Sequence, residues 1–164
     1  MWISARGIIN ISGSLPLGFY KKITSAQIER GAIVVVCPDL ENPAIQLGKE
    51  RGYLSAGWGC KGRLRPLMKR VLALPGDLVE ISEGSVRVNG RKIKYSSRLE
   101  VDGARRPLPL LPASGEVPNG YVWLFSGYSP SSFDSRYFGP IKQSAIKSIV
   151  TPRYVWHDPR HDPH

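Results

Sequence analysis

Three short segments of the chain hold hydroxyl, amine and carboxylate side chains at close spacing. Residues 10–20 read NISGSLPLGFY, a serine-containing loop stiffened by proline. Residues 69–77 read KRVLALPGD, a strand-like run with a lysine at its start and a tight turn at its end. Residues 132–140 read SFDSRYFGP. A serine hydroxyl becomes a good nucleophile only when a base removes its proton, and an uncharged lysine amine is such a base.

Each of these features also has an ordinary structural interpretation when it is taken alone. Serines in loops rich in glycine and proline mostly form turns, and a single lysine is usually solvated. The order of the three segments is therefore more informative than any one of their residues.

The elements that must position these segments are mostly β-strands. Apolar and alternating runs separated by glycine and proline predict strands at residues 18–22, 32–37, 67–74, 78–82, 85–88, 91–95, 120–125 and 145–150. Asn89-Gly90 predicts a two-residue type I′ turn, because both positions then take a positive φ. Residues 24–30 favour one short turn, and the proline-rich residues 102–118 an irregular excursion.

We therefore expect one mainly β catalytic domain, residues 1–156, built of mixed, mostly antiparallel sheets with Pro/Gly-rich loops. Within the strand at 67–74, alternation places Lys69 on one face with Val71 and turns Arg70 away. Residues 157–164 are polar and interrupted by proline, so we expect a disordered tail there rather than a metal site.

Composition excludes several classes of protein. The chain has 164 residues, 41% of them hydrophobic, which is enough to bury a core, and two cysteines exclude a disulfide-rich scaffold. No stretch approaches the roughly 18 apolar residues of a membrane-spanning helix, and the first residues do not resemble a secretory signal. The formal net charge of +10 predicts an anionic neighbour, either nucleic acid or a lipid surface.

In this order, the three segments resemble the motifs of the type I signal peptidase family of Ser/Lys serine peptidases. The resemblance is closest to the conjugative-transfer branch, the TraF-type peptidases that process pilin precursors. Residues 10–20 resemble the serine box of that branch, residues 69–77 its lysine box, and residues 132–140 its C-terminal box. A lone Ser-Gly-Ser would carry no information, whereas the three boxes in order are specific.

The resemblance implies that Ser14 is the nucleophile and Lys69 its general base. It also implies that the backbone N–H of Ser14 and the hydroxyl of Ser12 form the oxyanion hole, with Gly13 permitting a close backbone approach. A lysine with an unperturbed pKa near 10.4 is neutral in about one molecule in 2,500 at pH 7. We therefore expect Lys69 to be buried against apolar side chains without a carboxylate partner, which lowers its pKa.

The third box supplies the supporting residues in the same resemblance. Ser132 matches the serine that orients the lysine, and Asp134 and Arg136 match a structural ion pair behind the site. Two positions depart from the family pattern. Most type I signal peptidases carry Gly-Asp-Asn where this chain reads Ser126-Gly127-Tyr128, and Leu15 replaces the methionine that usually follows the nucleophile.

The resemblance further implies a substrate and a location. Family substrates are extended segments with small residues before the scissile bond, and they bind as a strand beside the serine loop. The expected substrate is a pilin precursor or another exported protein of a conjugation or type IV secretion apparatus, either cleaved by water or cyclised through its own N-terminus. The reaction needs no metal or other cofactor.

The family works on the periplasmic face of the inner membrane and is held there by an N-terminal transmembrane helix, which would end just before Met1. We expect the membrane surface to be a partner, contacted by an apolar patch around the serine loop. This patch would comprise Trp2, Ile3, Ile8, Ile9 and Leu17. The sequence makes no prediction of the oligomeric state.

Cys37 and Cys60 are the two cysteines of the chain. Because the family works outside the cytoplasm, we expect a disulfide between them, which would contribute about 3 kcal/mol by closing the intervening loop. The alternative is a pair of unrelated thiols.

Two other functions remain open at this point. A self-cleaving repressor-type protease would use the same Ser/Lys chemistry, but it would need an N-terminal DNA-binding domain and an internal cleavage site, and neither is apparent. A basic β-module that binds nucleic acid would fit the net charge. Its aromatic residues, however, are not interleaved with basic ones as in a base-stacking surface, so we do not expect nucleic acid as a partner.

Overall fold

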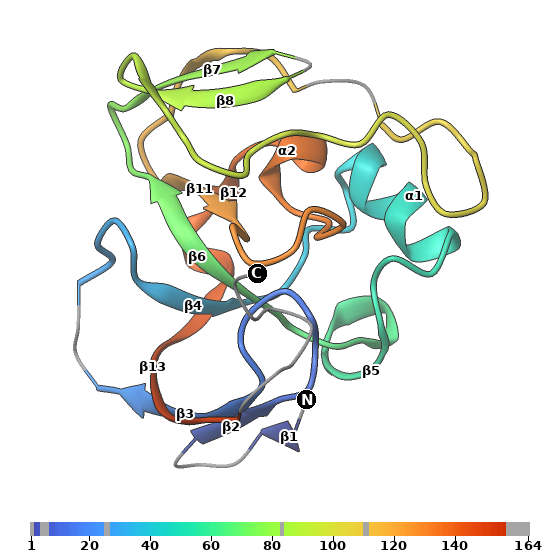
Figure 1. Cartoon of the computed structure of the whole chain (residues 1–164). Coiled ribbons are helices and arrows are strands. Elements are labelled where there is room, and N and C mark those ends of the chain that lie inside the picture. The colour runs from blue at the N-terminus through green and yellow to red at the C-terminus, as the bar shows by residue number, and fades with distance from the viewer. Residues whose placement is uncertain (1, 4–6, 25–26, 83, 110–111, 157–164) are drawn as a thin grey trace.

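The computed structural model of the chain describes residues 2–3, 7–24, 27–82, 84–109 and 112–156, with the backbone alone at residues 2–3. Its architecture is mainly β (Figure 1). The strands are β1 (Trp2–Ile3), β2 (Gly7–Asn10), β3 (Gly18–Ile23), β4 (Ile33–Val36), β5 (Ala56–Cys60), β6 (Leu67–Ala73), β7 (Leu78–Ser82), β8 (Ser85–Val88), β9 (Arg91–Lys92), β10 (Gly115–Glu116), β11 (Tyr121–Phe125), β12 (Ile141–Lys142) and β13 (Ile146–Val155). The helices are α1 (Pro43–Glu50), α2 (Ser135–Phe138) and the short 3₁₀ helices η1 (Lys61–Arg63) and η2 (Gln143–Ala145).

All of the described strands except β5 form two sheets. The larger has eight strands in the order β1-β2-β3-β13-β4-β6-β11-β12, and the smaller has four in the order β10-β7-β8-β9. The pairings between these strands are antiparallel. Figure 1 shows β7 and β8 at one end of the molecule, β1–β3 with β13 at the other, and the long strand β6 between them. The predicted fold class, mainly β with antiparallel sheets, is confirmed.

Strand β4 explains how one sheet can be buried on both of its faces. Val34 and Val36 belong to the largest apolar cluster, whereas Ile33 and Val35 belong to a second cluster on the opposite face. Because both faces are covered, the predicted strand at 32–37 reads as a continuous apolar run without alternation.

The predicted hairpin after β8 is present, but its second strand is short. Asn89 and Gly90 take φ values of 52° and 75°, as a type I′ turn requires. The strand predicted at 91–95 ends after two residues. Tyr95 takes a φ of 56°, which leaves the strand conformation, and the hydroxyl of Ser96 accepts a backbone N–H of β8 at 2.9 Å in place of a strand partner.

Strand β13 is longer than predicted, because it continues through a proline. Beyond Val150 this strand pairs with β3 alone, and its register shifts between Pro152 and Tyr154. Proline cannot donate a ladder hydrogen bond, so it is tolerated where a strand lacks a second neighbour or contains a bulge.

Several short elements were not predicted. Helix α1 begins at Pro43 behind the N-cap Asn42, whose side chain accepts the N–H groups of Ala44 and Ile45. Strands β1, β2, β5, β10 and β12 are short or rich in glycine. Residues 102–118 are irregular as predicted, apart from β10, which pairs with β7.

The turn predicted at 24–30 falls partly outside the described residues. The described part shows a turn that closes where Ala32 N–H donates to Glu29 O at 3.1 Å.

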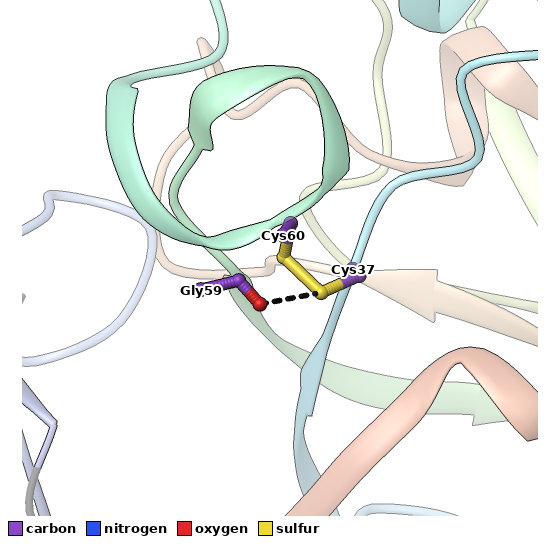
Figure 2. The surroundings of a disulfide bond; sticks show 3 residues. All are labelled: Cys37, Gly59 and Cys60. Atoms are coloured by element: carbon purple, nitrogen blue, oxygen red, sulfur yellow. Dashed lines mark hydrogen bonds between the residues drawn. A yellow bond between two sulfur atoms is a disulfide. The ribbon is translucent and has the colours of Figure 1, made fainter.

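A disulfide joins Cys37, directly after β4, to Cys60 at the end of β5 (Figure 2). The sulfur of Cys37 also lies 3.4 Å from the carbonyl oxygen of Gly59, drawn as a dashed line in Figure 2. A disulfide sulfur carries no proton, so we describe this approach as a contact rather than a hydrogen bond. The loop that the disulfide closes contains α1 and supplies Tyr53 and Ser55 to the cavity described below.

The apolar patch expected around the serine loop is wrong in one respect. Ile8 is fully buried, because its side chain packs in the second apolar cluster together with Tyr20, its cross-strand partner on β3. Ile9 and Leu17 are half-buried, and the side chains of Trp2 and Ile3 lie outside the described residues.

Among the described residues, no helix is long and apolar enough to cross a membrane, and no group of three or more histidine, cysteine or acidic side chains gathers as metal ligands would. The tail expected at residues 157–164 lies outside the described residues, so that expectation stays a prediction.

Candidate active site

The three polar segments meet at one point of the fold. Ser14 lies in the loop between β2 and β3, Lys69 on β6, and Ser132 between β11 and α2. The Nζ atom of Lys69 lies 2.7 Å from Ser14 Oγ and 2.6 Å from Ser132 Oγ. The two hydroxyl oxygens are 3.3 Å apart. One amine and two hydroxyls therefore form a closed triangle of hydrogen bonds.

Lys69 is almost completely buried. Its exposed fraction is 3%, whereas its neighbour Arg70 on the other face of β6 is exposed. Burial lowers the pKa of Lys69 to about 8, because the ammonium form loses its hydration. The carboxylate of Asp134 opposes this effect by raising the pKa, and the guanidinium of Arg136 lowers it further. Among the described residues, no carboxylate lies within 4 Å of the amine.

This environment makes an uncharged amine accessible near neutral pH. With a pKa of about 8, about a tenth of the molecules carry a neutral Lys69 at pH 7. As an ammonium, Lys69 donates hydrogen bonds to both Ser14 and Ser132. Once it has lost a proton, its lone pair can accept the proton of Ser14, and the geometry is then suitable for general-base activation of that hydroxyl.

Asp134 and Arg136 form a buried ion pair behind this triangle. The Nε and Nη2 atoms of Arg136 donate to the two carboxylate oxygens of Asp134 at 2.8 and 2.9 Å, and both side chains are at most 1% exposed. Arg136 Nη2 also donates to the backbone carbonyl of Ser132 at 3.0 Å. The ion pair thus holds the backbone of the residue that contacts Lys69.

Ser126 is a site residue to which the sequence analysis assigned no role. Its side chain is fully buried, and its hydroxyl donates to the backbone carbonyl of Ser14. Its backbone N–H donates to Asp134 Oδ2 at 3.1 Å. Ser126 therefore links the backbone of Ser14 to the buried ion pair. The departure from Gly-Asp-Asn at residues 126–128 was the signal that could have revealed it.

Ser12 lies exposed on the rim of the site, and its hydroxyl donates to Asn10 Oδ1 at 2.8 Å. A Cβ atom added at Gly13 would meet nothing within 4 Å, so the chain itself does not require glycine there. Gly13 itself lines the cavity described below. Leu15 turns the other way, is 3% exposed and packs in the second apolar cluster.

The polar triangle opens onto a cavity of about 530 Å³. Ser12, Ser14, Lys69 and Ser132 all line this cavity. The apolar part of its wall includes Met68, Leu99, Leu108, Phe133 and Tyr137. An extended peptide could thus place apolar side chains against the wall and a backbone carbonyl beside Ser14.

The chain belongs to the signal peptidase family, peptidase S26, whose pattern it matches over residues 9–156. This family is one of serine peptidases, and the resemblance inferred from the three boxes is confirmed. The chain has relatives in conjugation systems. It is 42% identical over 154 residues to the plasmid transfer protein TraF of Escherichia coli. The alignment covers 90% of this chain and 82% of that protein.

A second relative is the conjugal transfer protein TraF of Agrobacterium fabrum, strain C58, with 37% identity over 149 residues. The alignment covers 90% of this chain and 82% of that protein. Among solved structures, signal peptidase I of Enterococcus faecalis V583 matches with 22% identity and a TM-score of 0.46, over 78% of this chain and 100% of that chain.

Proposed function

We propose that this protein is a signal-peptidase-like serine endopeptidase that uses a Ser14–Lys69 dyad. The observation that carries the proposal is the buried amine of Lys69, 2.7 Å from Ser14 Oγ and without a carboxylate partner among the described residues. A paired lysine would stay charged, whereas this one has a lowered pKa and can act as a base.

The reaction follows from this geometry. Neutral Lys69 accepts the proton of Ser14 as Ser14 Oγ bonds to the scissile carbonyl carbon. The backbone N–H of Ser14 and the hydroxyl of Ser12 stabilise the resulting oxyanion. The Lys69 ammonium then gives its proton to the leaving amine, and Ser132 keeps Lys69 in position throughout. Attack on the acyl-enzyme by water releases a linear product, and attack by the substrate's own N-terminal amine releases a circular one.

We further propose that the substrate is a pilin precursor or another exported protein of a conjugative transfer or type IV secretion system. The names of the relatives, a plasmid transfer protein and a conjugal transfer protein, support the system. The disulfide between Cys37 and Cys60 supports a periplasmic location, because disulfides persist in oxidising compartments.

A membrane surface is the second partner that we propose. The net charge of +10 favours anionic lipid, and Ile11 in the serine loop is 62% exposed beside the cavity. In a flotation experiment at low salt, the protein should move to the top of the gradient with vesicles of anionic phospholipid. Salt at about 0.5 M should weaken this binding, because it shortens the Debye length well below 10 Å. Failure to float at low salt would remove this partner.

The proposed activity is tested with a synthetic pilin-precursor peptide that has an Ala-x-Ala segment before the scissile bond. Ser14→Ala and Lys69→Ala should each lower cleavage by about 10³-fold or more. Lys147→Ala, which changes an exposed lysine, should leave the rate unchanged. Mass spectrometry separates cleaved from cyclised product, because ring closure removes one water. Cleavage by Ser14→Ala at the wild-type rate would overturn the proposal.

A further inference from the structure

Asn10, the last residue of β2, organises the whole serine loop. Its side chain is fully buried. Its Nδ2 atom donates to the backbone carbonyls of Ser12, Leu15 and Pro16 at 3.1, 2.9 and 3.0 Å. Its Oδ1 atom accepts the backbone N–H of Ser12 at 3.1 Å and the hydroxyl of Ser12 at 2.8 Å. The carboxamide thus makes all of these hydrogen bonds to a single loop.

These contacts determine the orientation of the Asn10 amide. The three carbonyl groups can only accept, so the NH₂ group must face them. The oxygen of the amide therefore faces Ser12, and a backbone N–H can only donate to it. The hydroxyl of Ser12 must then be a donor as well, because Asn10 Oδ1 has no proton to give.

The direction of this hydrogen bond bears on the proposed oxyanion hole. A hydroxyl has a single proton, and in the resting site Ser12 uses it to donate a hydrogen bond to Asn10 Oδ1. Ser12 can stabilise an oxyanion only if the proton turns from Asn10 toward the cavity. After that turn, Asn10 Oδ1 still accepts the backbone N–H of Ser12, so no buried acceptor is left without a partner.

We propose that Asn10 is a positioning residue that holds the hydroxyl of Ser12 at the cavity and lets that O–H turn to donate a hydrogen bond to the oxyanion as the tetrahedral intermediate forms. This inference rests on the proposed function of Ser14 and Lys69. It differs from a merely structural role, in which Asn10 would shape the loop whether or not Ser12 carries a hydroxyl.

The test is a double-mutant cycle with the Ala-x-Ala peptide. Ser12→Ala should lower kcat by about 100-fold with little change in KM, as expected for one lost oxyanion donor. Asn10→Ala should lower kcat by roughly tenfold in the wild-type background and by less than about twofold in the Ser12→Ala background, because residues that act through one another are not additive. An equal loss in both backgrounds, or a loss confined to KM, would overturn the inference.

Asn10→Asp is the second variant, since it keeps the size of the side chain and its acceptor. A carboxylate accepts the hydrogen bond of the Ser12 hydroxyl more strongly than an amide does, but it cannot donate to the loop carbonyls that Nδ2 binds. We therefore expect kcat to fall in both backgrounds, and to fall about tenfold further in the wild-type background than in the Ser12→Ala background. Thermal unfolding reports whether each variant folds. If neither variant retains a native unfolding transition, Asn10 is a structural residue and the inference is rejected.

Asn42→Ala is the matched control. Asn42 is also an asparagine that binds backbone groups, since it accepts from Ala44 and Ile45 and donates to Phe138 O. Asn42→Ala should lower the melting temperature of the protein. Its effect on kcat should be small, and equal in the wild-type and Ser12→Ala backgrounds. Ser14→Ala tests the proposed function independently of the inference about Asn10. If Ser14→Ala is inactive and the losses at Asn10 and Ser12 multiply, the inference about Asn10 fails and the proposed function stands.

Discussion

Two cations are buried side by side in this protein, and their surroundings differ in one respect. Lys69 is 3% exposed and Arg136 is 1% exposed. Arg136 binds both oxygens of the Asp134 carboxylate, whereas the hydrogen-bond partners of Lys69 are two neutral hydroxyls. The paired guanidinium also donates to the backbone carbonyl of Ser132 and holds that backbone in place. The unpaired amine has a lowered pKa and can exchange a proton.

Two neighbouring buried cations can therefore serve different purposes, one to stabilise the fold and the other to exchange a proton. A buried charge is tolerated when it is paired and hydrogen-bonded, and otherwise the group tends to neutralise. The ion pair lies close enough to influence the amine electrostatically, but too far from it to form a salt bridge.

Replacing the amine by a group that cannot lose its proton should abolish the chemistry. An arginine remains charged at any accessible pH, so Lys69→Arg should lower kcat by about 10⁴-fold, near the upper limit for loss of a general base. Lys147→Arg is the control on an exposed site and should be unaffected. Single-turnover cleavage rates are the measurement. Activity within tenfold of wild type (about 1.4 kcal/mol in barrier) would contradict the role of Lys69 as base.

Breaking the ion pair should act mainly on stability. Asp134→Ala leaves the Arg136 guanidinium buried without its partner, which should lower the free energy of unfolding by about 3–5 kcal/mol. The control is Asp39→Ala, because Asp39 lies 3.7 Å from Lys142 in a largely exposed pair, worth less than about 1 kcal/mol. Denaturant unfolding measures both. A cost at Asp134 no larger than that at Asp39 would show that the buried pair has no structural role.

Removing the amine should stabilise the protein. A shift of the Lys69 pKa from 10.5 to about 8 corresponds to about 3 kcal/mol, at about 1.4 kcal/mol per unit. Between pH 8 and 10.5 the unfolded chain binds more protons at this residue than the folded one, so stability rises with pH there. Lys69→Met should therefore be more stable than wild type at pH 7, and the gain should shrink as the pH rises through this window. Unfolding curves at pH 7 and pH 10 test this, and a gain independent of pH would contradict it.

The loss of the Ser126 hydroxyl, which links the backbone of Ser14 to the buried ion pair, should have the smallest effect on the protein. Ser126→Ala removes the hydrogen bond to the Ser14 carbonyl and should lower kcat by roughly tenfold, equivalent to about 1.4 kcal/mol. Ser126→Gly, which restores the residue of the family pattern, should behave in the same way. Ser82→Ala is the control, since the exposed Ser82 hydroxyl also donates to a backbone carbonyl, that of Ser85, away from the cavity. Equal rates for Ser126→Ala and wild type would mean that this hydrogen bond does not position Ser14.

Much of the fold could be predicted, because local chemistry determines it. The apolar run of β4 and the Asn89-Gly90 turn both identify their elements without knowledge of the tertiary structure. Strand β13 could not be bounded from sequence, because Pro152 is tolerated only through its pairing with β3 alone. Helix α1 could have been found from its cap, since Asn42 precedes Pro43, a typical start of a helix.

The candidate site divides in the same way. Ser12, Ser14, Lys69 and Ser132 were expected from their boxes, and the structure places them along one cavity. Ser126 and Asn10 were assigned no role, because both bind mainly backbone carbonyls of the serine loop, although Asn10 also accepts the hydroxyl of Ser12. Such contacts depend on the path of the chain in three dimensions. The departure from Gly-Asp-Asn at residues 126–128 marks Ser126 as unusual, but it does not identify the carbonyl that Ser126 binds.

Direct titration of Lys69 tests whether burial lowers the pKa of its amine enough for it to act as a base. NMR of protein with ¹³C-labelled lysine, assigned by comparison with Lys69→Met, follows the protonation of this amine alone, and Lys147 provides an exposed lysine in the same spectrum. The account predicts a midpoint at about pH 8, with the rate of peptide cleavage rising tenfold per pH unit below the same value. A midpoint near 10.5, the ordinary value for a solvated lysine, would contradict it.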